Sequence, residues 1–118
     1  MVGHENDKKF RPVHGEDVEA VGKKILIGPR DGLDGFMREF SLAEGGHTPY
    51  HQHPWSHTVY VLQGEGKLTC GEKSFPLSPG SVAYLEADKV HGFSNSGSGE
   101  LRFLCLVPPT GDAYKEGD

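Results

Sequence analysis

Short runs of alternating apolar and polar residues recur along this chain, and a period of two is the period of a β-strand. In residues 100–107, for example, Leu101, Phe103 and Cys105 fall on one face of an extended chain. No segment repeats apolar residues at helical spacing over several turns. The pattern predicts strands at residues 18–21, 24–27, 36–42, 57–63, 67–70, 73–77, 81–86, 91–95 and 100–107.

Glycine and proline separate these runs at fairly even intervals, with 17 glycines and 8 prolines in the chain. Gly71-Glu72 is a short turn between two runs, so residues 67–77 are expected to form a hairpin. Many short strands with regular turn signals are typical of a sandwich or barrel. We therefore expect an all-β fold in a single domain over residues 18–109.

The two ends of the chain are polar and lie outside the strand pattern. Residues 1–17 are expected to form a flexible N-terminal arm, which could reach across to a second copy of the chain. Residues 110–118 follow Pro108 and Pro109 and are expected to be a polar C-terminal tail that frays.

Two of the expected strands carry residues that do not fit a simple inward and outward division. In residues 57–63 both faces are largely apolar, which is typical of a strand packed on two sides. In residues 36–42, Arg38 shares a face with Phe36 and Phe40. An inward arginine is a charged group within an apolar surface, so we expect Arg38 either to reach the rim or to meet an anion.

Length, charge and cysteine usage limit the classes of function. At 118 residues the chain can bury one core without disulfides, and Cys70 and Cys105, with no CxxC pair, are expected to be reduced. A formal charge of −5, without a run of lysine and arginine, argues against a nucleic-acid partner. The N-terminus lacks the apolar run of a signal peptide, and no stretch approaches the roughly 20 apolar residues of a membrane span. We therefore expect a cytoplasmic protein with no membrane partner.

Histidines are the residues most suited to chemistry in this sequence. His51, His53 and His57 lie in one short stretch, and in an extended strand His51 and His53 point the same way, at a spacing that suits one metal ion. A closed barrel could bring His91, from a later strand, opposite them. Four neutral imidazoles suit a divalent transition metal, and this ligand type does not choose among Mn, Fe, Co, Ni, Cu and Zn. His47 lies outside the pattern and is interpreted as a loop residue.

Two stretches resemble the motifs of a known family. Residues 45–64 resemble the first motif of the cupins, through the series Gly45, five residues, His51-Gln52-His53, three residues, His57, six residues and Gly64. Residues 79–95 resemble the second motif, through Pro79-Gly80 and then His91 followed after three residues by Asn95. The resemblance covers about two thirds of the chain. It implies a double-stranded β-helix, or jelly-roll, barrel of two packed antiparallel sheets, which pairs as a homodimer.

The sequence departs from the family pattern at the metal site. The family usually places glutamate where this chain has His57, whereas Ser81 and Glu86 replace residues that are not ligands. With His57 the chain resembles small bacterial cupins with a four-histidine site, which implies Mn or Fe, with Zn, Ni, Co and Cu as alternatives. Two adjacent coordination positions would then stay open for substrate. His57 cannot act as the base that a carboxylate could supply.

Three functions fit such a site. The first, which we favour from the sequence, is a metal-dependent, dioxygenase-like oxidoreductase acting on a small chelating oxygen-containing substrate. The second is a metal-dependent isomerase or lyase acting on a sugar or small acid. The third is a non-catalytic module that binds a metabolite or a metal. The fold does not choose among them, because the pocket walls decide the substrate.

Several further residues are candidates for the pocket or for supporting the metal ligands. Phe93 shares a strand face with His91, and Asn95 could hydrogen-bond to a ligand. Cys105 is either a thiol near the metal or a small buried residue. Aromatic residues such as Trp55 are more typical of packing. The candidate set is Arg38, Gln52, Phe93, Asn95, Phe103 and Cys105, with Phe36 and Phe40 as weaker candidates.

Overall fold

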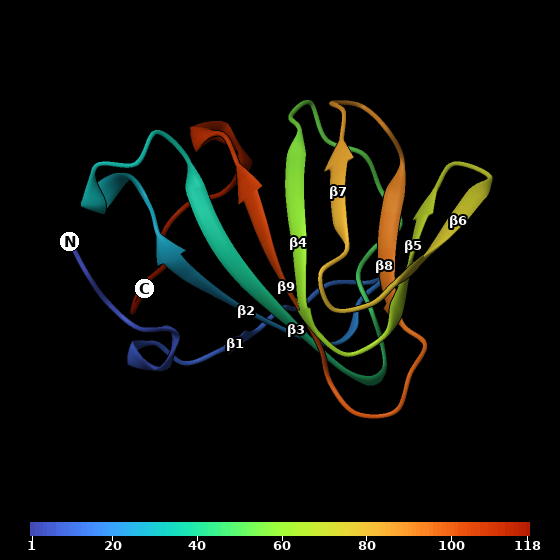
Figure 1. Ribbon diagram of the computed structural model, residues 1–118. Helices are drawn as coiled ribbons and strands as arrows, with labels where there is room; N and C mark the ends of the chain where they lie inside the picture. Colours follow the sequence, from blue (N-terminus) through green and yellow to red (C-terminus); the bar gives the residue numbers. More distant parts are fainter.

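Nine β-strands and three short 3-10 turns make up the chain, which contains no α-helix. The computed structural model describes all of residues 1–118, and its strands curl into a half-barrel (Figure 1). The all-β prediction is therefore confirmed. The strands are β1 (Arg11–Pro12), β2 (Glu19–Ile27), β3 (Phe36–His47), β4 (His57–Gln63), β5 (Gly66–Cys70), β6 (Lys73–Leu77), β7 (Val82–Leu85), β8 (His91–Asn95) and β9 (Leu101–Val107), and the turns are η1 (Glu5–Asp7), η2 (Pro29–Asp31) and η3 (Pro109–Gly111).

Strand β3 joins the two sides of the half-barrel. The sheet order is β6-β5-β8-β3-β9-β4-β7, and every pairing is antiparallel. Along Phe36–Leu42, β3 pairs with β9, whereas its last residue, His47, pairs with Ser94 of β8. The two layers implied by the family resemblance are therefore parts of one continuous sheet, which bends along β3.

The core lies inside the curl of this sheet. Fourteen buried apolar residues form one cluster, and Leu42, Val61, Leu101 and Phe103 are the most completely enclosed of its large side chains, with at most 1% exposure. In β9 the residues alternate between buried and intermediate exposure, as the sequence pattern indicates. Inward alternation along the strands thus produces a single core.

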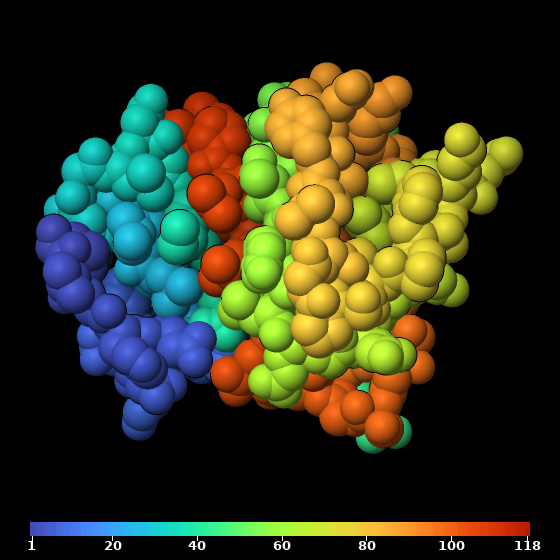
Figure 2. All heavy atoms as spheres, in the orientation of Figure 1, coloured from blue at the N-terminus to red at the C-terminus, as the bar shows by residue number.

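The prediction that the strand at residues 57–63, β4, packs on two sides is wrong. Val59 and Val61 face the core, but Tyr60 and Leu62 on the other face are 47% and 38% exposed. Their face is apolar yet uncovered, because β7 and β9 flank β4 within the sheet and no element packs across it. Figure 2 shows β4 and β7 side by side on this open surface.

The first half of the sheet is more continuous than the sequence suggests. The two runs predicted at residues 18–21 and 24–27 form the single strand β2, which pairs along β3 with register shifts near each end. Gly22 lies inside β2, where a Cβ would stand 3.1 Å from the Cβ of Phe10. The glycine that interrupts the apolar pattern therefore makes room for the N-terminal segment.

Both terminal segments, which we expected to form an arm and a tail, lie against the sheet. The Val13 backbone N–H donates to the Val21 carbonyl, extending the pairing of β1 with β2. At the other end, Tyr114 packs edge-on against Phe36, with ring centroids 5.2 Å apart. The two segments also contact each other, since the Arg11 Nε lies 3.1 Å from the Asp118 carboxylate, and both chain ends lie on the β2 side of the sheet (Figure 1). No helix has the length and apolar character needed to span a bilayer.

Candidate metal centre

A cavity of about 410 Å³ lies inside the curled sheet and contains the histidines. Its walls combine three kinds of residue. Imidazoles from the segment before β4 and from β4 and β8 form one part, and charged side chains of β2, β3 and the C-terminal segment form another. Phe40, Phe93 and Phe103 form an apolar wall, in which the Phe93 and Phe103 rings stack with centroids 4.4 Å apart.

Backbone pairing places His51 beside His91. The His51 N–H donates to the His91 carbonyl at 3.0 Å, and the His91 N–H donates to the His51 carbonyl at 2.9 Å. This isolated bridge adds the segment after β3 to the edge of β8. The two imidazoles, 40 positions apart in the sequence, therefore lie on adjacent backbone segments, and their ring centroids are 5.8 Å apart.

His53 is positioned by a hydrogen bond and an aromatic contact. Its carbonyl accepts a hydrogen bond from the Asp88 N–H at 2.6 Å. Its ring stacks on the Trp55 indole, with centroids 4.7 Å apart and an angle of 6° between the planes. These contacts fix both the backbone and the ring of His53 at the wall of the cavity.

Three histidines form the candidate metal group in this structure. One ligand nitrogen from each of His51, His53 and His91 lies within 4.8 Å of the others. This group is smaller than the expected group of four, because it does not include His57. The His57 ring is nevertheless close, with centroids 4.8 Å from His91 and 5.2 Å from His53. The His57 Nδ1 lies 3.3 Å from the Cys105 Sγ, and its Nε2 is buried without a hydrogen-bond partner.

Burial favours the neutral form of three of these histidines, which is the form that binds a metal. Burial is the main cause that lowers the pKa of His53 to about 4 and of His57 to about 3, with neighbouring histidines adding to the effect. Burial likewise lowers the pKa of His51. The His91 Nδ1 lies 2.8 Å from the Lys89 carbonyl, which can only accept, so this nitrogen carries the proton. Nε2 is therefore the ring nitrogen of His91 that can serve as a metal ligand.

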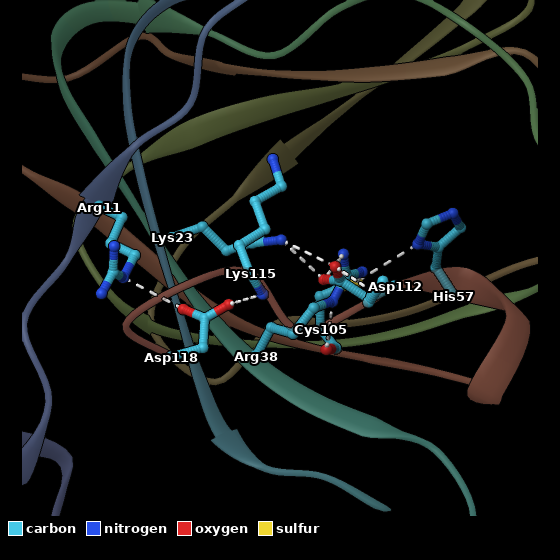
Figure 3. Close-up of polar contacts among 9 residues, drawn as sticks. Arg11, Lys23, Arg38, His57, Cys105, Asp112, Lys115 and Asp118 are labelled. Carbon is cyan, nitrogen blue, oxygen red and sulfur yellow. Dashed lines mark hydrogen bonds and ion pairs between the residues drawn. The ribbon is translucent and has the colours of Figure 1, made fainter.

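Charged side chains line the same cavity, and Arg38 and Asp112 lie near His57 (Figure 3). Lys23 donates to both Asp112 carboxylate oxygens at 2.9 and 2.8 Å, and Arg38 donates to Asp112 Oδ2 at 3.2 Å. Arg38 is only 6% exposed, so it meets an anion inside the fold, one of the two outcomes expected. Burial raises the pKa of the Asp112 carboxyl, but hydrogen bonds from Lys23 and from the Ala113 N–H, together with the Lys23 and Arg38 charges, bring it below its usual range.

The remaining candidates divide between the cavity and other places. Arg38, Phe93, Phe103 and Cys105 line the cavity, whereas Gln52 and Asn95 do not. Gln52 is exposed. The Asn95 amide nitrogen donates to the carbonyls of Leu42 and Gly99, so it ties β8 to β3 and to the following turn. His47, interpreted as a loop residue, is the last residue of β3 and lies outside the cavity lining.

Lys23, Asp112 and Trp55 are site residues that sequence reasoning did not select. Lys23 lies in a short gap between two predicted strands, and Asp112 lies in a polar tail. Neither position suggests from the sequence that its side chain lines a cavity. Trp55 follows His53 by two positions. This spacing was the one feature of the sequence that could have placed Trp55 beside the histidines. Its indole N–H is buried without a hydrogen-bond partner.

A family model matches most of the strands of the half-barrel. The model described as a cupin domain, Cupin_2, matches residues 38–107, a range that contains all four candidate ligands, His51, His53, His57 and His91. A 1-methylthio-D-xylulose 5-phosphate methylsulfurylase from Rhodospirillum rubrum is 30% identical over 88 residues, which are 75% of this chain and 56% of that protein. The chain therefore spans little more than half the length of this curated relative.

Solved structures show the same architecture. The polyketide cyclase RemF from Streptomyces resistomycificus has a TM-score of 0.85 and 28% identity, over 92% of this chain and 79% of the cyclase. A protein described as a predicted oxalate decarboxylase from Thermotoga maritima has a TM-score of 0.83 and 20% identity, over 92% of this chain and 98% of that one. At that identity the second structure shows a shared fold alone.

Proposed function

This chain belongs to the cupin family, and we propose that it is a metal-dependent enzyme acting on a small chelating oxygen-containing substrate. In this proposal His51, His53 and His91 bind one divalent transition metal ion, and His57 is the fourth ligand. Neutral imidazoles suit Mn or Fe as well as Zn, Ni, Co and Cu. The sequence resemblance to small four-histidine cupins favours Mn or Fe.

The unpaired nitrogen of His57 carries the proposal. Its Nε2 is buried without a partner beside three histidines that face one another. An unsatisfied buried polar atom costs about 1 to 3 kcal/mol, and a metal ion would satisfy it. The low pKa of His57 keeps its ring neutral, as ligation requires. The donor set therefore fits one transition metal ion.

A bound divalent ion would polarise a substrate oxygen, and a redox-active ion would also permit electron transfer. The protein itself offers few proton acceptors in the cavity. Asp112 is hydrogen-bonded to Lys23 and Arg38, and Asp118 is paired with Arg11 at 3.1 Å. A substrate that is already acidic, such as an enediol, a diketone or a catechol, suits a site without a free carboxylate base.

Redox-neutral chemistry on such a substrate is the reaction class that we propose first. Its support comes from two of the similar proteins, of which one is named a polyketide cyclase and the other a methylsulfurylase of a sugar phosphate. Neither name describes an oxygenase. Isomerisation, cyclisation or lyase chemistry would proceed with a redox-inert ion.

A dioxygenase-like reaction is the second candidate. The imidazoles of the site are neutral ligands that suit redox-active Fe or Mn. The neighbouring wall of Phe93 and Phe103 is apolar. A site of this kind could admit oxygen together with an apolar substrate.

Metal analysis of the protein as isolated, followed by turnover assays, tests the proposal. We expect close to one divalent ion per chain, lost from His53→Ala, and turnover of an enediol, diketone or catechol. Turnover without oxygen and with Zn supports the redox-neutral reaction, whereas oxygen uptake that requires Fe or Mn supports the dioxygenase. A bound ion whose spectrum none of these compounds alters would indicate a non-catalytic binding module and contradict the proposal.

His57 needs a separate test as the fourth ligand. His57→Ala should lower the metal content of the purified protein and change the spectrum of a Co-substituted sample. Full metal retention with an unchanged Co spectrum would exclude His57 and leave a three-histidine site.

We also propose that the protein forms a homodimer through the outer face of β4 and β7. Tyr60, Val82 and Tyr84 on this face are 47%, 74% and 67% exposed, and burial against a second copy would remove them from water. Light scattering should give twice the chain mass of 12.9 kDa, and Tyr84→Glu should give the monomer. A monomeric native protein would contradict this assembly.

A further inference from the structure

The lining of the cavity that holds the histidines has more positive than negative side chains. Arg11, Lys23, Arg38 and Lys115 line it, against the carboxylates of Asp112 and Asp118 (Figure 3). These side chains therefore carry a net charge of +2, before any metal charge is counted. An excess of this sign in a partly enclosed space attracts small anions.

Arg38 retains hydrogen-bonding capacity that the protein does not use. Its guanidinium has five N–H donors. Protein acceptors take three of them, through the Cys105 carbonyl, the Cys105 Sγ and Asp112 Oδ2. The two that are left belong to Nη1 and Nη2, the pair that binds carboxylates and phosphates in a forked geometry.

Lys23 adds a second cationic donor at the same place. Its Nζ has three N–H donors, and both of its hydrogen bonds go to Asp112. The side chain is 21% exposed, whereas the Asp112 side chain is 8% exposed. Lys23 is thus the more accessible member of the pair, and it can contact a ligand while it holds Asp112.

This charged group lies close to the histidines. The Arg38 Nη2 donates to the Cys105 Sγ at 3.1 Å, and the same sulfur lies 3.3 Å from the His57 Nδ1. Only one sulfur atom therefore separates the guanidinium from the His57 ring. A small molecule can reach both the histidines and Arg38 within one cavity.

We propose that Arg38 and Lys23 form a recognition site for an oxyanion, which is a carboxylate or phosphate group at one end of the substrate. The other end would lie at the histidines, and that part of the inference rests on the proposed function. Substrates would then be small molecules with two oxygen-rich ends, such as a phosphorylated or carboxylated enediol or diketone.

Asp112 has a defined part in this site. It neutralises one of the two charges of Lys23 and Arg38 and holds both side chains in place through three hydrogen bonds. It therefore leaves one net positive charge for the ligand. Removing its charge should strengthen anion binding, whereas removing the Lys23 charge should weaken it, and a purely structural ion pair would give neither effect.

The test measures binding of inorganic phosphate and malonate to protein from which metal has been removed by a chelator. Each probe should raise the midpoint of thermal unfolding as its concentration rises, which gives a dissociation constant for each variant. Lys23→Met and Arg38→Met should weaken binding at least about tenfold, as expected for a lost charge-assisted hydrogen bond. Asp112→Asn should tighten it, and tighter binding of phosphate or of malonate identifies the group recognised.

Lys67→Met is the matched control, because it removes one positive charge from an exposed position of β5 outside the cavity. It should bind both probes as the native protein does. The inference is overturned if Lys23→Met and Asp112→Asn both bind phosphate and malonate with the dissociation constants of the native protein. This holds even if Arg38→Met fails to fold. Metal-free protein keeps this result separate from the proposed function, which is tested by metal content and turnover of the metal-loaded protein.

Discussion

His51 and His91 exchange both of their backbone hydrogen bonds, at 3.0 and 2.9 Å, although 40 positions separate them in the sequence. A residue pair joined in this way is held as closely as neighbours within a β-ladder. Two candidate ligands are thus positioned by the backbone before any metal binds. This preorganisation is the basis of the first prediction.

Replacement of His91 by alanine should lower the metal affinity at least about tenfold, because the loss of groups that merely support metal ligands already has an effect of that size. His51→Ala should act similarly. Metal content after dialysis against a competing chelator measures the effect. His47→Ala is the control, since His47 lies outside the cavity lining, and a loss as large in His47→Ala would contradict the assignment.

Stability of the metal-free protein should fall as the pH falls from 6.5 to 4. Over this range an unfolded histidine takes up a proton, whereas folding lowers the pKa of His53 to about 4 and of His57 to about 3. The unfolded state therefore binds more protons, so acid favours unfolding, by up to about 1.4 kcal/mol per pH unit for each histidine. Urea unfolding at several pH values measures this slope.

His57→Gln is the matched variant for the pH experiment, because glutamine does not titrate. Its stability should depend less steeply on pH than that of the native protein between pH 6.5 and 4. An identical slope in the two proteins would show that His57 does not contribute to the acid sensitivity.

The buried pair of Lys24 and Glu39 should be sensitive to single changes. Glu39 is 0% exposed, its carboxylate lies 3.7 Å from the Lys24 Nζ, and neither of its oxygens is hydrogen-bonded. Lys24→Met should destabilise the fold by about 3 kcal/mol, because it leaves Arg102 as the remaining cation near the buried Glu39 carboxylate. The double variant Lys24→Met with Glu39→Met should recover most of this loss in urea unfolding. A double variant no more stable than the single one would contradict the argument.

Gly64 should tolerate alanine much less well than Gly71 does. Both adopt a left-handed backbone, with φ of +83° and +59°, but only at Gly64 would a Cβ collide with the Glu100 carbonyl oxygen. Gly71→Ala should cost about 1 kcal/mol for its backbone alone, and Gly64→Ala about 2 to 4 kcal/mol because steric overlap adds to it. Thermal unfolding of the two variants, compared directly, gives the difference, and equal losses would exclude the collision.

The strand pattern was readable in the sequence where one face of a strand is buried. Alternation in β9 predicted its inward residues, and the turn at Gly71 predicted the hairpin of β5 and β6. The outer face of β4 was misread, because an apolar residue has the same appearance in a sequence whether another element covers it or not. Burial of that face depends on which elements pack across it, and local pattern carries no such information.

At the site, the sequence by itself determined the residue types and their order, because two histidines on alternate positions of a strand suffice to suggest a chelate. Only the tertiary structure decided which imidazoles meet. Backbone pairing set His51 against His91, while His57 at the start of β4 was turned towards Cys105. The tertiary structure also brings Asp112, from a polar tail, against Lys23 and Arg38. Contacts between distant segments arise from the closure of the sheet, and no short stretch of the sequence contains that geometry.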